Sequence, residues 1–119
     1  MDKIKSHKDL KVWQESMTLV TQIYKISEDF PKHEIYGLSS QIRRASVSIP
    51  SNIAEGAGRK GDNEFKRFLF IALGSLSEVE TQLEISQRLN YIDTIEEINK
   101  SIYFIRNMLS NLIKSLNWT

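Results

Sequence analysis

Apolar residues recur along most of the chain at alternating steps of three and four positions. At 100° per residue, such steps place them on one face of an α-helix. Four stretches follow this pattern, and they predict helices over residues 8–28, 34–58, 62–90 and 94–116. Only a few residues separate one stretch from the next. Because short connections make consecutive helices antiparallel neighbours, we expect an all-α fold, an up-down-up-down antiparallel four-helix bundle.

The length and composition of the chain limit what this bundle can be. A chain of 119 residues is enough for one hydrophobic core, so a single domain over residues 1–119 is expected. Sixteen basic against fifteen acidic side chains give a net charge of +1, which excludes a chain-wide field that would attract nucleic acid or a membrane. The chain has no cysteine and no apolar run of membrane-spanning length. These features favour a soluble, cytoplasmic protein.

The first predicted helix carries two apolar stripes, although a bundle core needs only one. We expect the core stripe to consist of Leu10, Trp13, Met17, Val20 and Tyr24. The third helix is also apolar nearly all round between positions 65 and 76. Unpaired apolar faces of this length are typical of an interface, so we predict a homo-oligomer. The expected interface residues are Val12, Leu19, Ile23, Ile26, Phe70 and Leu73. The alternative is that these side chains lie under the terminal segments of the same chain.

A continuous polar strip borders the apolar stripe of the second predicted helix. It consists of Gln41, Arg44, Ser48, Asn52 and Glu55. We expect a structural role for this strip, because an unpaired charge beside a core is costly. Residues 31–61 carry a net charge of +3 and residues 62–90 a net charge of −2. One interpretation is that the opposite charges of the two segments compensate each other. The other is that some of the basic residues contact RNA phosphates. The candidates for that contact are Arg43, Arg59 and Lys60.

Several short runs in and around the second helix match a known protein family. They are Tyr36-Gly37-Leu38, Gln41-Ile-Arg-Arg-Ala45, Ser48-Ile-Pro-Ser-Asn-Ile-Ala-Glu-Gly56 and Gly74-Ser75-Leu76. In these runs the chain resembles the 23S rRNA-intervening sequence proteins of bacteria, which are related to the accessory variability protein of diversity-generating retroelements. The resemblance implies a four-helix bundle that assembles as a homopentamer and has no established enzymatic activity. The retroelement protein is a basic pentamer that binds nucleic acid and a reverse transcriptase, whereas this chain is almost neutral.

The residue types needed for catalysis or metal binding are present, but not in a pattern that supports either. His7 and His33 have no second ligand residue at the spacing that a metal site needs. Glu80 and Glu84 share a helix face with Arg88, which is typical of a solvent-exposed charged face. We therefore predict a non-enzyme with no cofactor and no metal, a scaffold or adaptor for an RNA or protein partner. The alternative of a different class is a small bundle enzyme or metal-binding protein that uses helix carboxylates.

Overall fold

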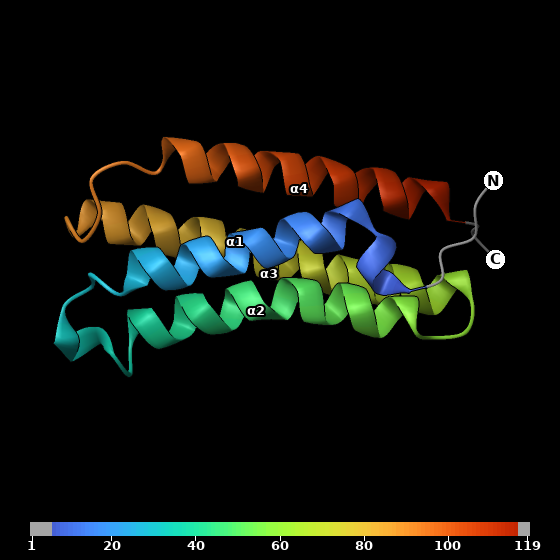
Figure 1. Ribbon diagram of the computed structural model, residues 1–119, viewed down its shortest axis with the longest axis horizontal. Helices are drawn as coiled ribbons and strands as arrows, with labels where there is room; N and C mark the ends of the chain where they lie inside the picture. Colours follow the sequence, from blue (N-terminus) through green and yellow to red (C-terminus); the bar gives the residue numbers. More distant parts are fainter. Residues whose placement is uncertain (1–5, 117–119) are drawn as a thin grey trace.

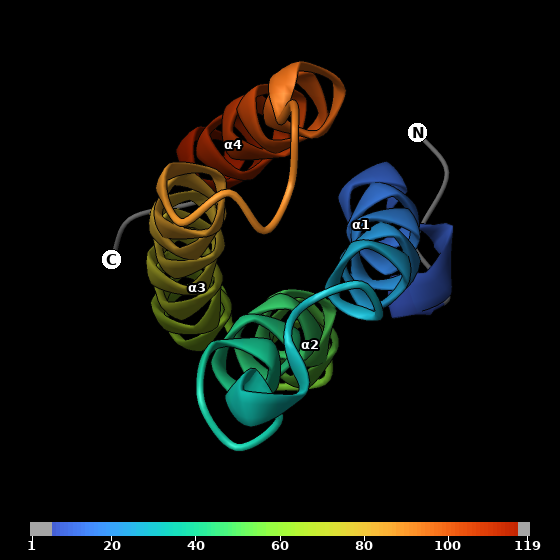
Figure 2. The same ribbon diagram turned by 90° about the vertical axis from the view of Figure 1, so that its left-hand side faces the viewer.

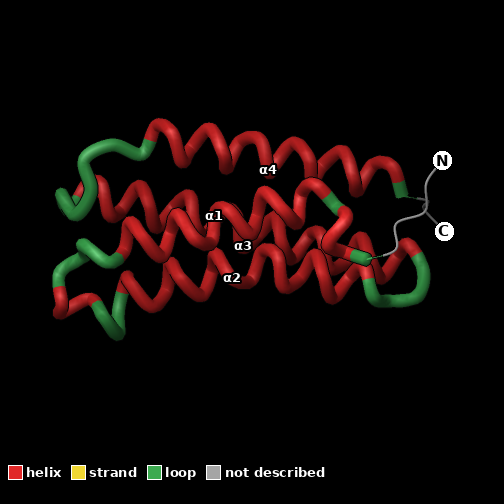
Figure 3. The backbone as a smooth tube through the Cα atoms, in the orientation of Figure 1, coloured by secondary structure: helices red, strands yellow, loops and turns green. Residues whose placement is uncertain are grey.

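The protein is a bundle of four long helices, seen in a computed structural model that describes residues 6–116. Consecutive helices run in opposite directions, and no strand occurs within the described range (Figures 1 and 3). The bundle measures 46 × 25 × 22 Å. The predicted fold class is therefore confirmed. The elements are the short 3₁₀ turns η1 (His7–Asp9) and η2 (Lys32–Glu34) and the helices α1 (Lys11–Ser27), α2 (Leu38–Ala57), α3 (Asp62–Arg88) and α4 (Glu96–Ser115).

Each helix lies within a few residues of its predicted range, and the largest displacement is at the start of α2. The chain forms η2 first, and Gly37 then provides the turn into Leu38. The carboxylate of Glu34 accepts a hydrogen bond from the Leu38 backbone N–H at 3.0 Å, which caps the helix. A Cβ on Gly37 would lie 2.6 Å from this carboxylate, so the cap needs glycine at that position.

Glu34 also joins the two connections at one end of the bundle. The hydroxyl of Tyr91, between α3 and α4, donates a 2.8 Å hydrogen bond to the second carboxylate oxygen of Glu34. The bond from the Leu38 N–H, followed by that from Tyr91, lowers the pKa of Glu34. The ring of Phe30 packs against Tyr91 at 5.6 Å between centroids. The α1–α2 connection is thereby tied to the α3–α4 connection.

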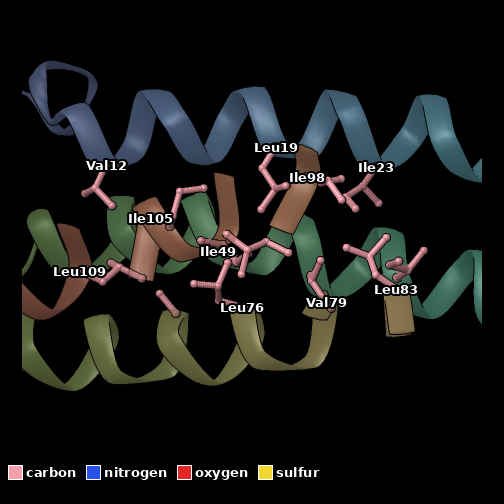
Figure 4. Packing of buried hydrophobic residues seen from close by; sticks show 14 of the residues in the cluster. Val12, Leu19, Ile23, Ile49, Leu76, Val79, Leu83, Ile98, Ile105 and Leu109 are labelled. Carbon is pink, nitrogen blue, oxygen red and sulfur yellow. The ribbon is translucent and has the colours of Figure 1, made fainter. Parts of the chain in front are cut away.

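The four helices surround one core in the order of the chain (Figure 2). Small residues let α2 and α3 approach closely. The hydroxyls of Ser48 and Ser75 are hydrogen-bonded at 2.8 Å, and a Cβ added to Gly56 would come within 2.7 Å of Phe68 Cβ. Aliphatic residues of all four helices meet between them (Figure 4). No helix within residues 6–116 is long and apolar enough to cross a membrane.

The two apolar faces of α1 are reversed relative to the prediction. Val12, Leu19 and Ile23 lie in the core of the single subunit, with Leu19 and Ile23 fully buried. Met17 and Tyr24, which were expected in the core, are 41% and 42% exposed. The expected interface role is therefore wrong for Val12, Leu19 and Ile23, because their side chains are inaccessible to a second chain.

Two buried serines explain the reversal. Ser16 and Ser27 continue the stripe of Leu19 and Ile23, and each hydroxyl donates a 2.7 Å hydrogen bond to the carbonyl four residues earlier. Because its hydroxyl is hydrogen-bonded within its own helix, each serine can be buried in the core, and its small side chain lets two helices lie close together. The opposite face carries Trp13 and Tyr24, whose polar groups favour a position with access to water.

The other expected interface residues differ in accessibility. Ile26 and Leu73 are half-buried and pack against the core cluster. Phe70 is 51% exposed on the outer side of α3. Of the six residues, Phe70 is the one that presents most of its side chain to another molecule.

Candidate functional site: a groove between two helices

The reversed orientation of α1 leaves an apolar groove on the outside of the subunit, between α1 and α2. We call it the α1/α2 groove. Its floor and walls are apolar apart from one serine. It is lined by Trp13, Met17 and Val20 of α1 and by Val47, Pro50, Ser51 and Ala54 of α2. Exposed apolar surface that extends over several helical turns is typical of a protein–protein contact.

The groove continues toward the α1–α2 connection, where it becomes basic. Val47 also lines the adjoining hollow, together with Tyr24, Ile35, Ser40, Arg43 and Arg44. The two hollows therefore form one surface, apolar at the Trp13 end and carrying two guanidinium groups at the other.

Arg43 has a structural role at this basic end. Its Nε donates a 2.7 Å hydrogen bond to the Ser27 hydroxyl, and its Nη2 donates one of 3.3 Å to the Tyr24 carbonyl. The guanidinium also lies 4.8 Å from the centroid of the Tyr24 ring, a cation–π contact. These contacts join α2 to the end of α1. The Arg43 guanidinium, which the sequence suggested as an RNA contact, therefore already has partners within the subunit.

The predicted polar strip lies on the opposite edge of α2, toward α3. Asn52 Nδ2 donates to the carbonyl and to the hydroxyl of Ser48, at 2.8 and 2.9 Å. Ser48 in turn bonds Ser75 of α3. These hydrogen bonds hold Asn52 against Ser48 and join Ser48 to α3.

The charged members of the strip do not pair with each other. Glu55 forms a 3.0 Å ion pair with Arg59, one turn further along the chain. Gln41 and Arg44 are exposed, and Arg44 has no ion pair or hydrogen bond within residues 6–116. Within the described residues of one subunit no contact supports the structural role expected for Arg44, so that role stays a prediction. Its neighbour Arg43 makes the structural contacts instead.

The three candidate RNA contacts are not gathered into one patch. Arg43 and Arg59 are sixteen positions apart, which corresponds to about 24 Å along a helix axis. Arg59 is paired with Glu55 and lies 5.1 Å from the centroid of the Phe68 ring, while Lys60 is exposed in the α2–α3 connection. The ability of these residues to bind RNA stays a prediction.

Polar groups are also buried at positions that the sequence did not single out, among them Lys66 and Gln82 of α3. Lys66 of α3 is only 2% exposed, and this burial lowers its pKa, an effect that Asp62 partly opposes. Gln82 Oε1 is buried without a hydrogen-bond partner in the part of the chain that the structure describes, beside a hollow that Arg44 and Glu78 also line. Neither position interrupts an apolar stripe, so the sequence pattern carries no signal for them.

The carboxylates and histidines are spread over the surface in separate contacts. Glu80 accepts a 2.8 Å hydrogen bond from Arg106 of α4, and Glu84 pairs with Arg88 at 3.0 Å. His7 packs edge-on against Trp13, with 5.1 Å between ring centroids. Among the described residues, no three acidic, histidine or cysteine side chains converge on a point where they could hold a metal ion.

The fold defines the chain as an antiparallel four-helix bundle protein with an exposed apolar groove between α1 and α2. Residues 8–111 match the family model of the 23S rRNA-intervening sequence proteins, so the chain belongs to this family. A solved structure from Bacteroides thetaiotaomicron, described as a protein of unknown function from the S23 ribosomal protein family, is similar to it. The two share 29% sequence identity with a TM-score of 0.80, over 87% of this chain and 96% of the other. No curated protein matches the chain.

Proposed function

We propose that this protein is a non-catalytic assembly module, whose subunits associate into a closed homo-oligomer that holds a partner. The observation that carries the proposal is the α1/α2 groove. It exposes apolar surface over several turns of two helices, and association would remove this surface from water. The resemblance to the family supports five subunits.

A protein is the partner that we favour over RNA. Binding to RNA depends on several cations placed along a phosphate backbone. Here Arg43 is held by Ser27 and Tyr24, and Arg59 by Glu55, at separate places on α2. The chain as a whole has a net charge of only +1, so it has no strong overall attraction to a nucleic acid. An assembly of such subunits offers repeated surfaces, so that several weak contacts to one partner act together.

The association itself is testable by light scattering coupled to size-exclusion chromatography. We expect the wild-type protein to elute with a mass that is a multiple of 13.8 kDa, five-fold if the implied pentamer forms, and to approach one subunit on strong dilution. Moderate salt should leave the mass nearly unchanged, because apolar burial drives the contact. A mass of one subunit at every concentration would contradict the proposal.

A further inference from the structure

A second exposed apolar surface lies on the outer side of α3. We call it the Phe70 face and define it by Phe70, Ile71 and Gly74. Phe70 and Ile71 are exposed, and Gly74 follows four and three positions later, which places it beside them on the helix. Nothing lies within 4 Å of a Cβ added to Gly74. Glycine weakens a helix interior relative to alanine, and packing inside the subunit does not account for it here.

The α1/α2 groove is a hollow and the Phe70 face is an exposed helix ridge. A groove between two antiparallel helices accepts the ridge of a third helix. A large aromatic side chain that enters such a hollow is a typical anchor of an interface. Gly74, one turn from Phe70, has no side chain to hold the two backbones apart.

The helices that carry these surfaces also differ in charge. Together, α1 and α2 carry a net charge of +2, from Lys11, Lys25, Arg43 and Arg44 against Glu15 and Glu55. In contrast, α3 carries −2, from Asp62, Glu64, Glu78, Glu80 and Glu84 against Lys66, Arg67 and Arg88. Opposite net charges favour the approach of α3 of one subunit to α1 and α2 of another, and disfavour contacts between like helices.

The two surfaces cannot meet within one subunit. Seen along the bundle, α1 and α3 lie on different sides of α2 (Figure 2). Met17 and Val47 of the groove and Phe70 and Ile71 of the Phe70 face are all exposed on the subunit surface. A contact between them therefore requires two copies of the chain.

We propose that the Phe70 face of one subunit docks into the α1/α2 groove of the next. This inference rests on the proposed function, since it names the surfaces through which the subunits associate. Because the two surfaces differ, the contact is head-to-tail. Each subunit uses its groove toward one neighbour and its Phe70 face toward the other, and the series closes into a ring when the rotation per subunit allows it.

A mixing experiment tests the head-to-tail contact. Met17→Glu places a charge in the groove and leaves the Phe70 face intact, whereas Phe70→Glu does the reverse. Each variant alone should have the mass of one subunit in light scattering, because its remaining surface finds no partner. An equimolar mixture should form a one-to-one pair with twice the mass, because one variant contributes an intact groove and the other an intact Phe70 face.

The matched control is Phe104→Glu on the exposed side of α4, which lies outside both surfaces and should retain the wild-type mass. Helix content from circular dichroism verifies that each variant is folded, and Val47→Glu with Ile71→Glu provides a second pair for the same mixture. If the wild type is oligomeric but either variant keeps its mass, or the mixture stays at one subunit, the head-to-tail contact is wrong while the assembly module stands. A wild type that is itself a single subunit would instead overturn the proposed function and this contact together.

Discussion

Replacing Leu19 with glutamate is expected to unfold the subunit rather than divide an oligomer. Leu19 is fully buried where α1 meets the core, so the new carboxylate would have neither water nor a basic partner. The expected loss in the free energy of unfolding exceeds about 4 kcal/mol. A domain of this size has roughly 5–15 kcal/mol in total. Urea titration followed by circular dichroism measures the loss.

Met17→Glu is the matched control, because Met17 precedes Leu19 by two positions and lies on the opposite side of the same helix. It should keep the wild-type helix content as an isolated subunit, with the free energy of unfolding changed by about 0.5 kcal/mol or less. If the two variants exchanged these results, α1 would have to present its other face to the core.

The second large effect is expected at Gly56, where α2 passes close to α3. Alanine at this position would place its Cβ 2.7 Å from Phe68 Cβ and 3.0 Å from Phe65 Cδ1. Because Phe68 Cβ is fixed to the backbone of α3, the helices themselves would have to separate. We expect Gly56→Ala to lower the free energy of unfolding by about 1–3 kcal/mol, the range typical of overpacking.

Gly74→Ala tests the same chemical change in open space. With nothing within 4 Å of the added Cβ, the gain in helix propensity should raise subunit stability by up to about 1 kcal/mol. Both glycine variants should be compared in the Phe70→Glu background, so that association does not contribute to the measured unfolding. Effects of the same sign at the two positions would contradict the distinction between a close helix contact and a free surface.

The sequence predicted four antiparallel helices because the spacing of apolar residues reports helical periodicity directly. It did not decide which face of α1 is buried, since both faces are apolar. The deciding residues, Ser16 and Ser27, are polar by type and become compatible with a core only through bonds to their own helix. The residue type alone does not show whether a serine hydroxyl is hydrogen-bonded to its own helix.

The roles of Arg43 and Arg44 could not be predicted from the sequence either. Arg43 and Arg44 are adjacent, and the side that each presents depends on the rotation of α2 against α1 and α3. Arg43 meets Ser27, sixteen positions earlier, and this contact exists only after the two helices have packed. For the same reason, the bond between Glu34 and Tyr91 could not be predicted, because it joins two connections that are 57 positions apart.

The most direct test of the central claim is to measure whether the α1/α2 groove is covered in solution. The chain contains no cysteine, so a single introduced thiol reports on one position. Met17 and Phe104 are similarly exposed in the isolated subunit, at 41% and 54%. In the assembled protein, Met17→Cys should react with a maleimide much more slowly than Phe104→Cys, and adding Phe70→Glu should remove this protection. Equal labelling rates at the two positions, at concentrations where the protein is folded, would contradict the account.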